Sequence, residues 1–198
     1  MSRLGQVFLA SVLLVCCAAA PKREQLAVPD VRQSTDYTCG VSALQAVLGY
    51  YGIGAREDQL AKEMAATRQD GVAPEAIVRV ARAHGLTADM RENMTVDDLG
   101  AALLQHRPVI VELQAWADGH RTDWVNDWDD GHYAIVIGIE GDELVFEDPS
   151  VLGSRAVLAR REFEARWHDT DFGRRHIRTG IVFGGRAPAP PPSRVRME

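Results

Sequence analysis

One cysteine in this sequence stands where a nucleophile would be useful. Cys39 opens an apolar segment in which Leu44, Val47 and Leu48 recur with helical spacing. The N-terminus of a helix carries a partial positive charge and free N–H groups, which lower the pKa of a thiol and favour the nucleophilic thiolate. Gln33 could donate its side-chain N–H to the oxyanion that forms when a thiolate attacks a carbonyl group. A buried thiol in a core helix is the alternative for this block.

A histidine and an aspartate lie farther along the chain, at the two ends of a predicted β-hairpin. His132 opens an apolar strand over residues 133–139, and a partner strand over residues 143–147 leads directly to Asp148. If residues 140–142 form the turn, the two side chains meet at the open end of the hairpin. They share one face only if paired residue numbers sum to an even value or a bulge corrects the register.

Together these residues form a candidate catalytic set. An aspartate beside the histidine would hold the imidazole in the right tautomer, and the imidazole would in turn stabilise the thiolate. The sequence therefore predicts Cys39 as nucleophile, His132 as base, Asp148 as orienting residue and Gln33 in the oxyanion hole. Taken singly, the histidine could instead be a structural or capping residue, and the aspartate could simply start a turn before Pro149.

Residues 33–40, the strand that follows His132 and the pair Asp148-Pro149 resemble the peptidase family that removes double-glycine leaders from bacteriocin precursors. The similarity covers roughly residues 31–183. The resemblance implies a papain-like fold, and it assigns the family's catalytic Gln, Cys, His and Asp to the same four positions. We expect a stand-alone, exported member of this family.

The sequence departs from the family pattern in three ways. Thr38 precedes the nucleophile, where members with known leader cleavage usually have Asp. Those members are often fused to an ABC transporter and act on the cytoplasmic side, whereas we expect this chain to act without such a domain and to be exported. The segment before His132 is also long and rich in Trp and Asp. These departures weaken the link to bacteriocin leaders and leave the predicted thiol hydrolysis intact.

That Trp/Asp-rich segment, residues 116–128, could form one wall of a substrate cleft. We expect Trp128, Asp130 and Gly131 to contact substrate, with the acidic residues favouring basic substrates. Alternatively, the tryptophans anchor a long loop on the core and the acids are solvated. We predict residues 167–171 to be a polar loop.

No metal ion or cofactor is expected. The aspartates do not follow the spacing of an EF-hand calcium loop. Neither Cys39 nor the histidines show the paired spacings of zinc ligands. The predicted chemistry needs only the side chains of this chain.

The remaining pattern places helices first and strands second. Helices are predicted at residues 39–52, 57–66, 74–85, 95–107 and 162–167, and strands at 109–113, 133–139, 144–146, 156–158 and 177–183. This order is typical of an α+β fold. We expect the papain-like form of it, with N-terminal helices packed on a C-terminal antiparallel β-sheet.

The chain is long enough for one compact domain with one core. We expect a signal peptide or lipoprotein signal at 1–20, a linker at 21–30, the papain-like domain at 31–185 and a disordered Pro-rich tail at 186–198. Cys17 would carry a lipid anchor if the signal is of the lipoprotein type. Removal of the signal leaves Cys39 as the only cysteine, which excludes an intrachain disulfide.

Charge excludes one class of partner. The chain has 22 basic and 28 acidic residues and no basic cluster interleaved with aromatics, so nucleic acid is not expected to bind. The leading hypothesis is a monomeric cysteine peptidase that acts on peptides or proteins in the periplasm, outside the cell or at the membrane. A thiol-dependent amidase or acyl transferase, or a non-catalytic envelope binding module, are the alternatives.

Overall fold

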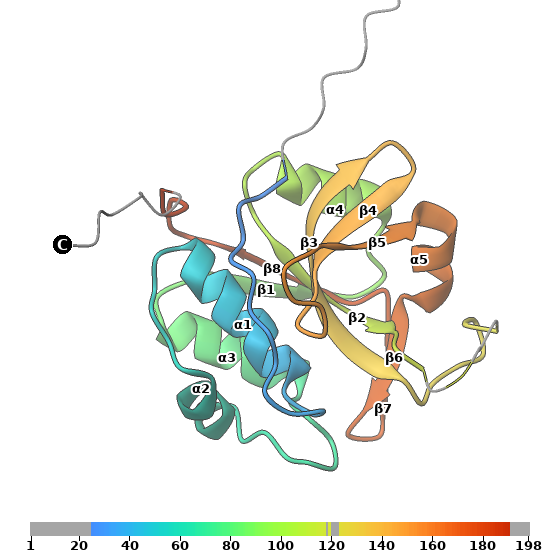
Figure 1. Ribbon diagram of the computed structural model, residues 1–198, viewed down its shortest axis with the longest axis horizontal. Coiled ribbons are helices and arrows are strands. Elements are labelled where there is room, and N and C mark those ends of the chain that lie inside the picture. Colours follow the sequence, from blue (N-terminus) through green and yellow to red (C-terminus); the bar gives the residue numbers. More distant parts are fainter. Residues whose placement is uncertain (1–24, 118, 120–122, 191–198) are drawn as a thin grey trace, which may run out of the picture.

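The computed structural model describes residues 25–117, 119 and 123–190 (Figure 1). Its helices are α1 (Cys39–Tyr50), α2 (Glu57–Glu63), α3 (Pro74–Ala83), α4 (Val96–Leu103) and α5 (Arg160–Arg166). Its strands are β1 (Thr87–Arg91), β2 (Val109–Gln114), β3 (Gly131–Glu140), β4 (Glu143–Glu147), β5 (Ala156–Ala159), β6 (His168–Asp171), β7 (Arg174–Ile177) and β8 (Gly180–Gly184). None of the described helices is long and apolar enough to cross a membrane.

The centre of the molecule is a six-stranded sheet with the order β1-β8-β2-β3-β4-β5. Every neighbouring pair in it is antiparallel. Strands β6 and β7 form a separate antiparallel hairpin beside β2. The predicted α+β class with an antiparallel sheet is therefore confirmed.

Helices cover both faces of this sheet, because successive strand side chains point to opposite sides. On β3, Ile135 and Ile137 join the core beneath α1, α2 and α3, whereas Ala134 and Val136 join the core shared with α4 and α5. Figure 1 shows α1 to α3 gathered together, apart from α4 and α5. The first core fixes α1, which begins at Cys39, against the strand that carries His132.

The hairpin of β3 and β4 contains a register shift. Near the turn, Ile139 pairs with Leu144, and the two numbers sum to an odd value. A bulge next to Gly138 shifts the pairing, so that Ile135 pairs with Glu147 and the sum becomes even. A bulge is one of the two solutions that the sequence allowed for bringing His132 and the residue after β4 to one face.

Several details of the secondary structure differ from prediction. The predicted polar loop at 167–171 contains strand β6, and β1 was not predicted. The predicted strand at 177–183 covers the last residue of β7 and most of β8, because Arg178 has a φ of 48° and breaks the extended conformation. Helix α2 ends at Glu63, since Ala65 has a φ of 56°.

The boundaries of the domain also differ from prediction. The segment expected to be a linker, 21–30, packs on the domain over its described part: Leu26 and Val28 are buried, and the Leu26 N–H donates to the Ile137 carbonyl at 2.8 Å. At the other end, the Ala189 N–H donates to the Tyr50 carbonyl at 2.8 Å. The predicted signal at 1–20 and tail residues 191–198 lie outside the described residues.

Candidate active site

Cys39 is the first residue of α1, so its thiol lies at the positive end of the helix. The first turn of α1 approaches β3 closely, because residue 40 is a glycine. A Cβ atom at Gly40 would lie 2.5 Å from Val72 Cγ2 and 2.9 Å from Tyr133 Cδ2. Cys39 itself is half-buried and lines a cavity. The thiol is thus held against the strand of the predicted base and faces open space.

His132 and Asp148 meet at the open end of the β3–β4 hairpin. His132 Nε2 lies 2.8 Å from Asp148 Oδ1, and both side chains are buried. Since Nε2 faces the carboxylate, Nδ1 is the ring nitrogen left for the hydrogen bond with the Cys39 thiol. The three predicted groups therefore form one continuous chain of contacts.

This chain of contacts shifts the pKa of each member. Burial would raise the pKa of the Cys39 thiol, but the hydrogen bond and charge of His132, with the N–H groups of Tyr133 and Gly40, outweigh burial and lower it. Burial likewise opposes a charged His132, yet Asp148 and Cys39 raise its pKa to about 10. The arrangement favours a thiolate–imidazolium pair at neutral pH.

The Asp148 carboxylate is held by several donors. Burial would raise its pKa, but the hydrogen bonds from His132, the Ser150 N–H and the Trp116 indole keep the pKa below its usual value. Ser150 N donates to Oδ1 at 2.8 Å, and Trp116 Nε1 donates to Oδ2 at 3.1 Å. Asp148 therefore starts a turn and orients the histidine as well. The contribution of Trp116 was not predicted from sequence.

Gln33 lies beside the same turn. Its backbone N–H donates to the Pro149 carbonyl at 3.0 Å, and its Oε1 accepts from Ser150 Oγ at 3.3 Å. Its Nε2 donates to the Thr35 carbonyl at 2.9 Å. A side-chain amide has two N–H donors, and this bond engages one of them. Gln33 is not among the residues that line the cavity of Cys39.

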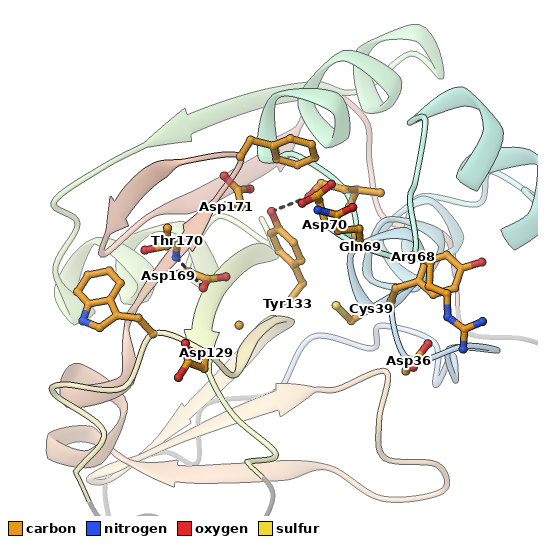
Figure 2. A pocket seen from close by; sticks show the side chains of 16 residues that line it. Asp36, Cys39, Arg68, Gln69, Asp70, Asp129, Tyr133, Asp169, Thr170 and Asp171 are labelled. Atoms are coloured by element: carbon orange, nitrogen blue, oxygen red, sulfur yellow. Dashed lines mark hydrogen bonds between the residues drawn. The ribbon is translucent and has the colours of Figure 1, made fainter.

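The cavity beside Cys39 has a volume of about 330 Å³ and an acidic wall (Figure 2). Strand β6 forms one side of it, opposite the loop before α3. Its charged lining residues are Asp36, Arg68, Asp70, Asp129, Asp169 and Asp171. In the view of Figure 2, Asp129, Asp169 and Asp171 lie on one side of Tyr133, and Cys39, Asp36 and Arg68 lie on the other.

Two of the three predicted substrate contacts line this cavity. Gly131 does so beneath the Asp169 carboxylate, whose two oxygens would lie 2.4 Å from a Cβ atom at residue 131. Trp128 also lines the cavity, and its ring packs at a tilt against the His168 ring with centroids 4.4 Å apart. The tryptophan therefore anchors its loop as well as walling the cavity.

The structure does not bring Asp130 to the cavity. Its backbone N–H donates to Gln114 Oε1 at 2.9 Å, and its carbonyl accepts from the Ala115 N–H at 2.9 Å. Asp130 thus lies at the join of β2 and β3, and its neighbour Asp129 lines the cavity instead.

Sequence reasoning missed the acidic wall supplied by β6. A signal was present, because Phe172 and Gly173, with φ values of 42° and 77°, form the tight turn between β6 and β7. A glycine-containing dipeptide between two short polar runs is a hairpin signal. Its neighbours, Asp169 and Asp171, would then have been expected on one face of a strand.

Comparison with known proteins identifies the family. Residues 25–173 match the sequence profile of the Peptidase_C39 like family. An uncharacterized protein of Methanothermobacter marburgensis is 27% identical over 121 residues, which are 61% of this chain and 71% of that protein.

Solved structures share the fold at low sequence identity. A candidate C39-like peptidase from Bacillus anthracis has a TM-score of 0.63 and 18% identity, covering 83% of this chain and 99% of that one. The peptidase domain of Streptococcus ComA, a bifunctional ABC transporter of a quorum-sensing pathway, has a TM-score of 0.55 and 21% identity. The match covers 79% of this chain and 97% of that one.

A double-glycine-motif protease from an AMS/PCAT transporter, solved with its leader peptide, has a TM-score of 0.55 and 18% identity, covering 82% of this chain and 95% of that one. The papain-like fold that the resemblance implied is confirmed by these structures. The chain belongs to the Peptidase_C39 like family, whose structural neighbours are papain-like cysteine peptidase domains.

Proposed function

We propose that this protein is a cysteine peptidase that hydrolyses peptide bonds through a thioester on Cys39. The observation that carries the proposal is the continuous contact from the Asp148 carboxylate through the His132 imidazole to the Cys39 thiol, at the wall of a cavity. A binding protein built on the same fold would need none of these groups. Membership of a peptidase-like family supports the same conclusion.

Acylation follows from the charges of the Cys39 thiolate and the His132 imidazolium. The Cys39 thiolate attacks the carbonyl carbon of the scissile bond, and the electron pair of the C=O bond moves to oxygen. The Cys39 N–H, which takes no part in the helical ladder, and the second Gln33 amide N–H stabilise this oxyanion. The C–N bond then breaks as the His132 imidazolium gives its proton to the leaving amine.

Deacylation restores the thiolate–imidazolium pair of Cys39 and His132. Neutral His132 takes a proton from a water molecule, whose oxygen attacks the thioester carbonyl. The C–S bond breaks, the carboxylic acid product leaves, and the thiolate and imidazolium are regenerated. Throughout both steps Asp148 keeps the imidazole oriented, because it binds Nε2 and leaves Nδ1 facing the sulfur.

The substrate is a peptide or protein segment, and the cavity supports a preference for basic side chains. Asp36, Asp70 and Asp169 line it, and Arg68 is the only cationic residue among its described lining residues. Carboxylates of one sign in a concave wall raise the local concentration of cationic groups.

The direct test is a peptide-library digestion followed by mass spectrometry. We expect cleavage by the wild-type protein, enrichment of Lys or Arg near the cut, and no cleavage by Cys39→Ala. Products that carry an added amine at the new C-terminus would indicate acyl transfer. A library left intact by a correctly folded protein would contradict the proposal.

We also propose that the mature chain works outside the cytoplasm. The support is the N-terminal sequence, where Arg3 precedes an apolar run at residues 7–15 that ends in small residues. Membrane fractionation of wild type and Cys17→Ala tests the anchor. Release of the variant alone would support lipidation of Cys17, and release of both would support a soluble exported form.

A further inference from the structure

Three ionisable side chains from three different strands, two buried and one half-buried, converge behind the acidic wall. Glu112 comes from β2, Asp171 from the end of β6 and His176 from β7. Glu112 is 2% exposed and His176 is 1% exposed. The Asp171 side chain is 14% exposed and reaches the cavity wall. The cluster therefore lies inside the protein and touches the cavity at one point.

The three side chains have the geometry of an ion site. Each offers one ligand atom, and these atoms all lie within 4.8 Å of one another. The His176 ring lies between the two carboxylates: Nδ1 is 3.6 Å from Glu112 Oε2, and Nε2, the other ring nitrogen, is 2.9 Å from Asp171 Oδ1. Four ligands at about 2.1 Å from a zinc ion lie about 3.4 Å apart, so binding one ion requires one ring nitrogen and both carboxylates to move closer together.

Hydrogen bonding within the described residues leaves this cluster incomplete. Glu112 Oε2, Asp171 Oδ2 and His176 Nδ1 are buried polar atoms without a hydrogen-bond partner. An unsatisfied buried polar atom costs free energy, and a buried carboxylate costs more. Three such atoms side by side indicate that a ligand satisfies them.

Arg174, a basic side chain that affects the charge of Asp171, is already engaged. Arg174 contacts Glu75 and Glu92 on the outside of the cluster. Glu112 Oε1 accepts a hydrogen bond from Tyr133 Oη at 2.9 Å, which fixes that carboxylate with Oε2 turned away from the tyrosine. Within the described residues, the Glu112 carboxylate is thus held by Tyr133 at one oxygen and has no hydrogen bond at the other.

We propose that Glu112, Asp171 and His176 bind one divalent transition-metal ion. An imidazole with two carboxylates suits zinc and related ions, whereas calcium and magnesium prefer all-oxygen sites. Tyr133 supports the Glu112 ligand from behind, as partners of metal ligands commonly do. The ion links β2 to the β6–β7 hairpin and so holds the acidic wall of the cavity in place. This site is independent of the peptidase chemistry at Cys39.

The test is zinc binding to purified, chelator-treated protein, measured by equilibrium dialysis and by calorimetry. A thiolate beside an imidazole also binds zinc, so the ligand variants and the control are made in a Cys39→Ala parent. The wild-type protein is measured as well. We expect about one zinc per chain in the Cys39→Ala parent. Cobalt in place of zinc should give visible d–d absorption bands, which report inner-sphere ligands.

Two ligand variants and one matched control complete the test. Glu112→Gln, which keeps the side-chain shape, and His176→Ala should each weaken zinc binding by roughly tenfold or more. His84→Ala is the control: His84 Nε2 lies 2.8 Å from Glu63 Oε2, and this histidine–carboxylate pair has no third ligand among the described residues. It should bind zinc as the parent does.

A thermal readout keeps the test decisive if a variant folds poorly. Zinc should raise the unfolding midpoint of the Cys39→Ala parent, because an ion that binds only the folded state stabilises it, and EDTA should reverse the rise. A parent that binds no zinc, or binding that Glu112→Gln leaves unchanged, would overturn the proposal. The cluster would then be held by protonated carboxyl groups alone.

Discussion

His132 Nε2 lies 2.8 Å from Asp148 Oδ1, across the open end of the hairpin formed by β3 and β4. The contact depends on the bulge next to Gly138, which brings both side chains to one face of the hairpin, where the His132 ring contacts Cys39, the first residue of α1. A hairpin without that bulge would send one of the two side chains to the opposite face of the sheet. Backbone register therefore decides whether the imidazole is oriented toward the thiol.

Replacing Asp148 by Asn tests this orientation. The amide carries no charge to stabilise the imidazolium, so the pKa of His132 should fall from its raised value. We expect kcat to drop by roughly 10²–10⁴-fold, the range of general acid–base contributions, with little change in KM. NMR titration of His132 and steady-state kinetics measure the two effects. An unchanged kcat would show that Asp148 serves only its turn with Ser150.

Trp116 is a positioning residue for the same carboxylate. Its indole N–H donates to Asp148 Oδ2 at 3.1 Å, although the side chain is 57% exposed. Trp116→Phe removes that donor and keeps the ring, so we expect a fall in kcat of several-fold, much smaller than for Asp148→Asn. The pH profile of kcat should shift with it. Identical pH profiles of kcat for wild type and variant would show that Trp116 does not position Asp148.

Gln33→Ala tests the oxyanion donor. Loss of one such donor typically lowers kcat by about 10²–10³-fold and leaves substrate binding nearly intact. Ser150→Ala is the matched control, because it removes the hydroxyl that donates to Gln33 Oε1 at 3.3 Å and leaves the amide N–H groups in place. The control should retain most of its activity. Equal losses in both variants would indicate that Gln33 acts through packing of the turn.

Gly40→Ala tests the close approach of α1 to β3. The new Cβ atom would lie 2.5 Å from Val72 Cγ2, so the helix or the loop must shift, at a cost of about 1–3 kcal/mol. For a chain of this size we expect the unfolding midpoint to fall by roughly 2–12 °C. Gly54→Ala is the control, since nothing lies within 4 Å of a Cβ there. Calorimetry that finds both variants as stable as wild type would contradict the packing.

The sequence predicted those parts of the site that depend on local pattern. Cys39 was expected at a helix start because the apolar spacing begins there, and the meeting of His132 and Asp148 followed from a short hairpin between them. The bulge could be named only as one of two solutions, because a register is set by packing on both faces of the sheet.

Other features depend on long-range contacts that no local pattern reports. Strand β1 is a polar run at the sheet edge, and β6 carries His and Asp where β-branched residues are expected. Glu112 and His176 are far apart in sequence and show no ligand spacing, so their cluster was not predicted. Leu26 and Val28 were assigned to a linker because two apolar residues in a polar stretch carry no periodicity.

The pH dependence of Cys39 alkylation tests the central claim most directly. Because the pKa of Cys39 is lowered and that of His132 is raised to about 10, the thiolate should persist well below the usual thiol pKa of about 8.5. Iodoacetamide should therefore react rapidly at neutral and mildly acidic pH. In His132→Ala the reaction should require a markedly higher pH. Profiles that both rise near pH 8.5, in wild type and in His132→Ala alike, would contradict the thiolate–imidazolium pair.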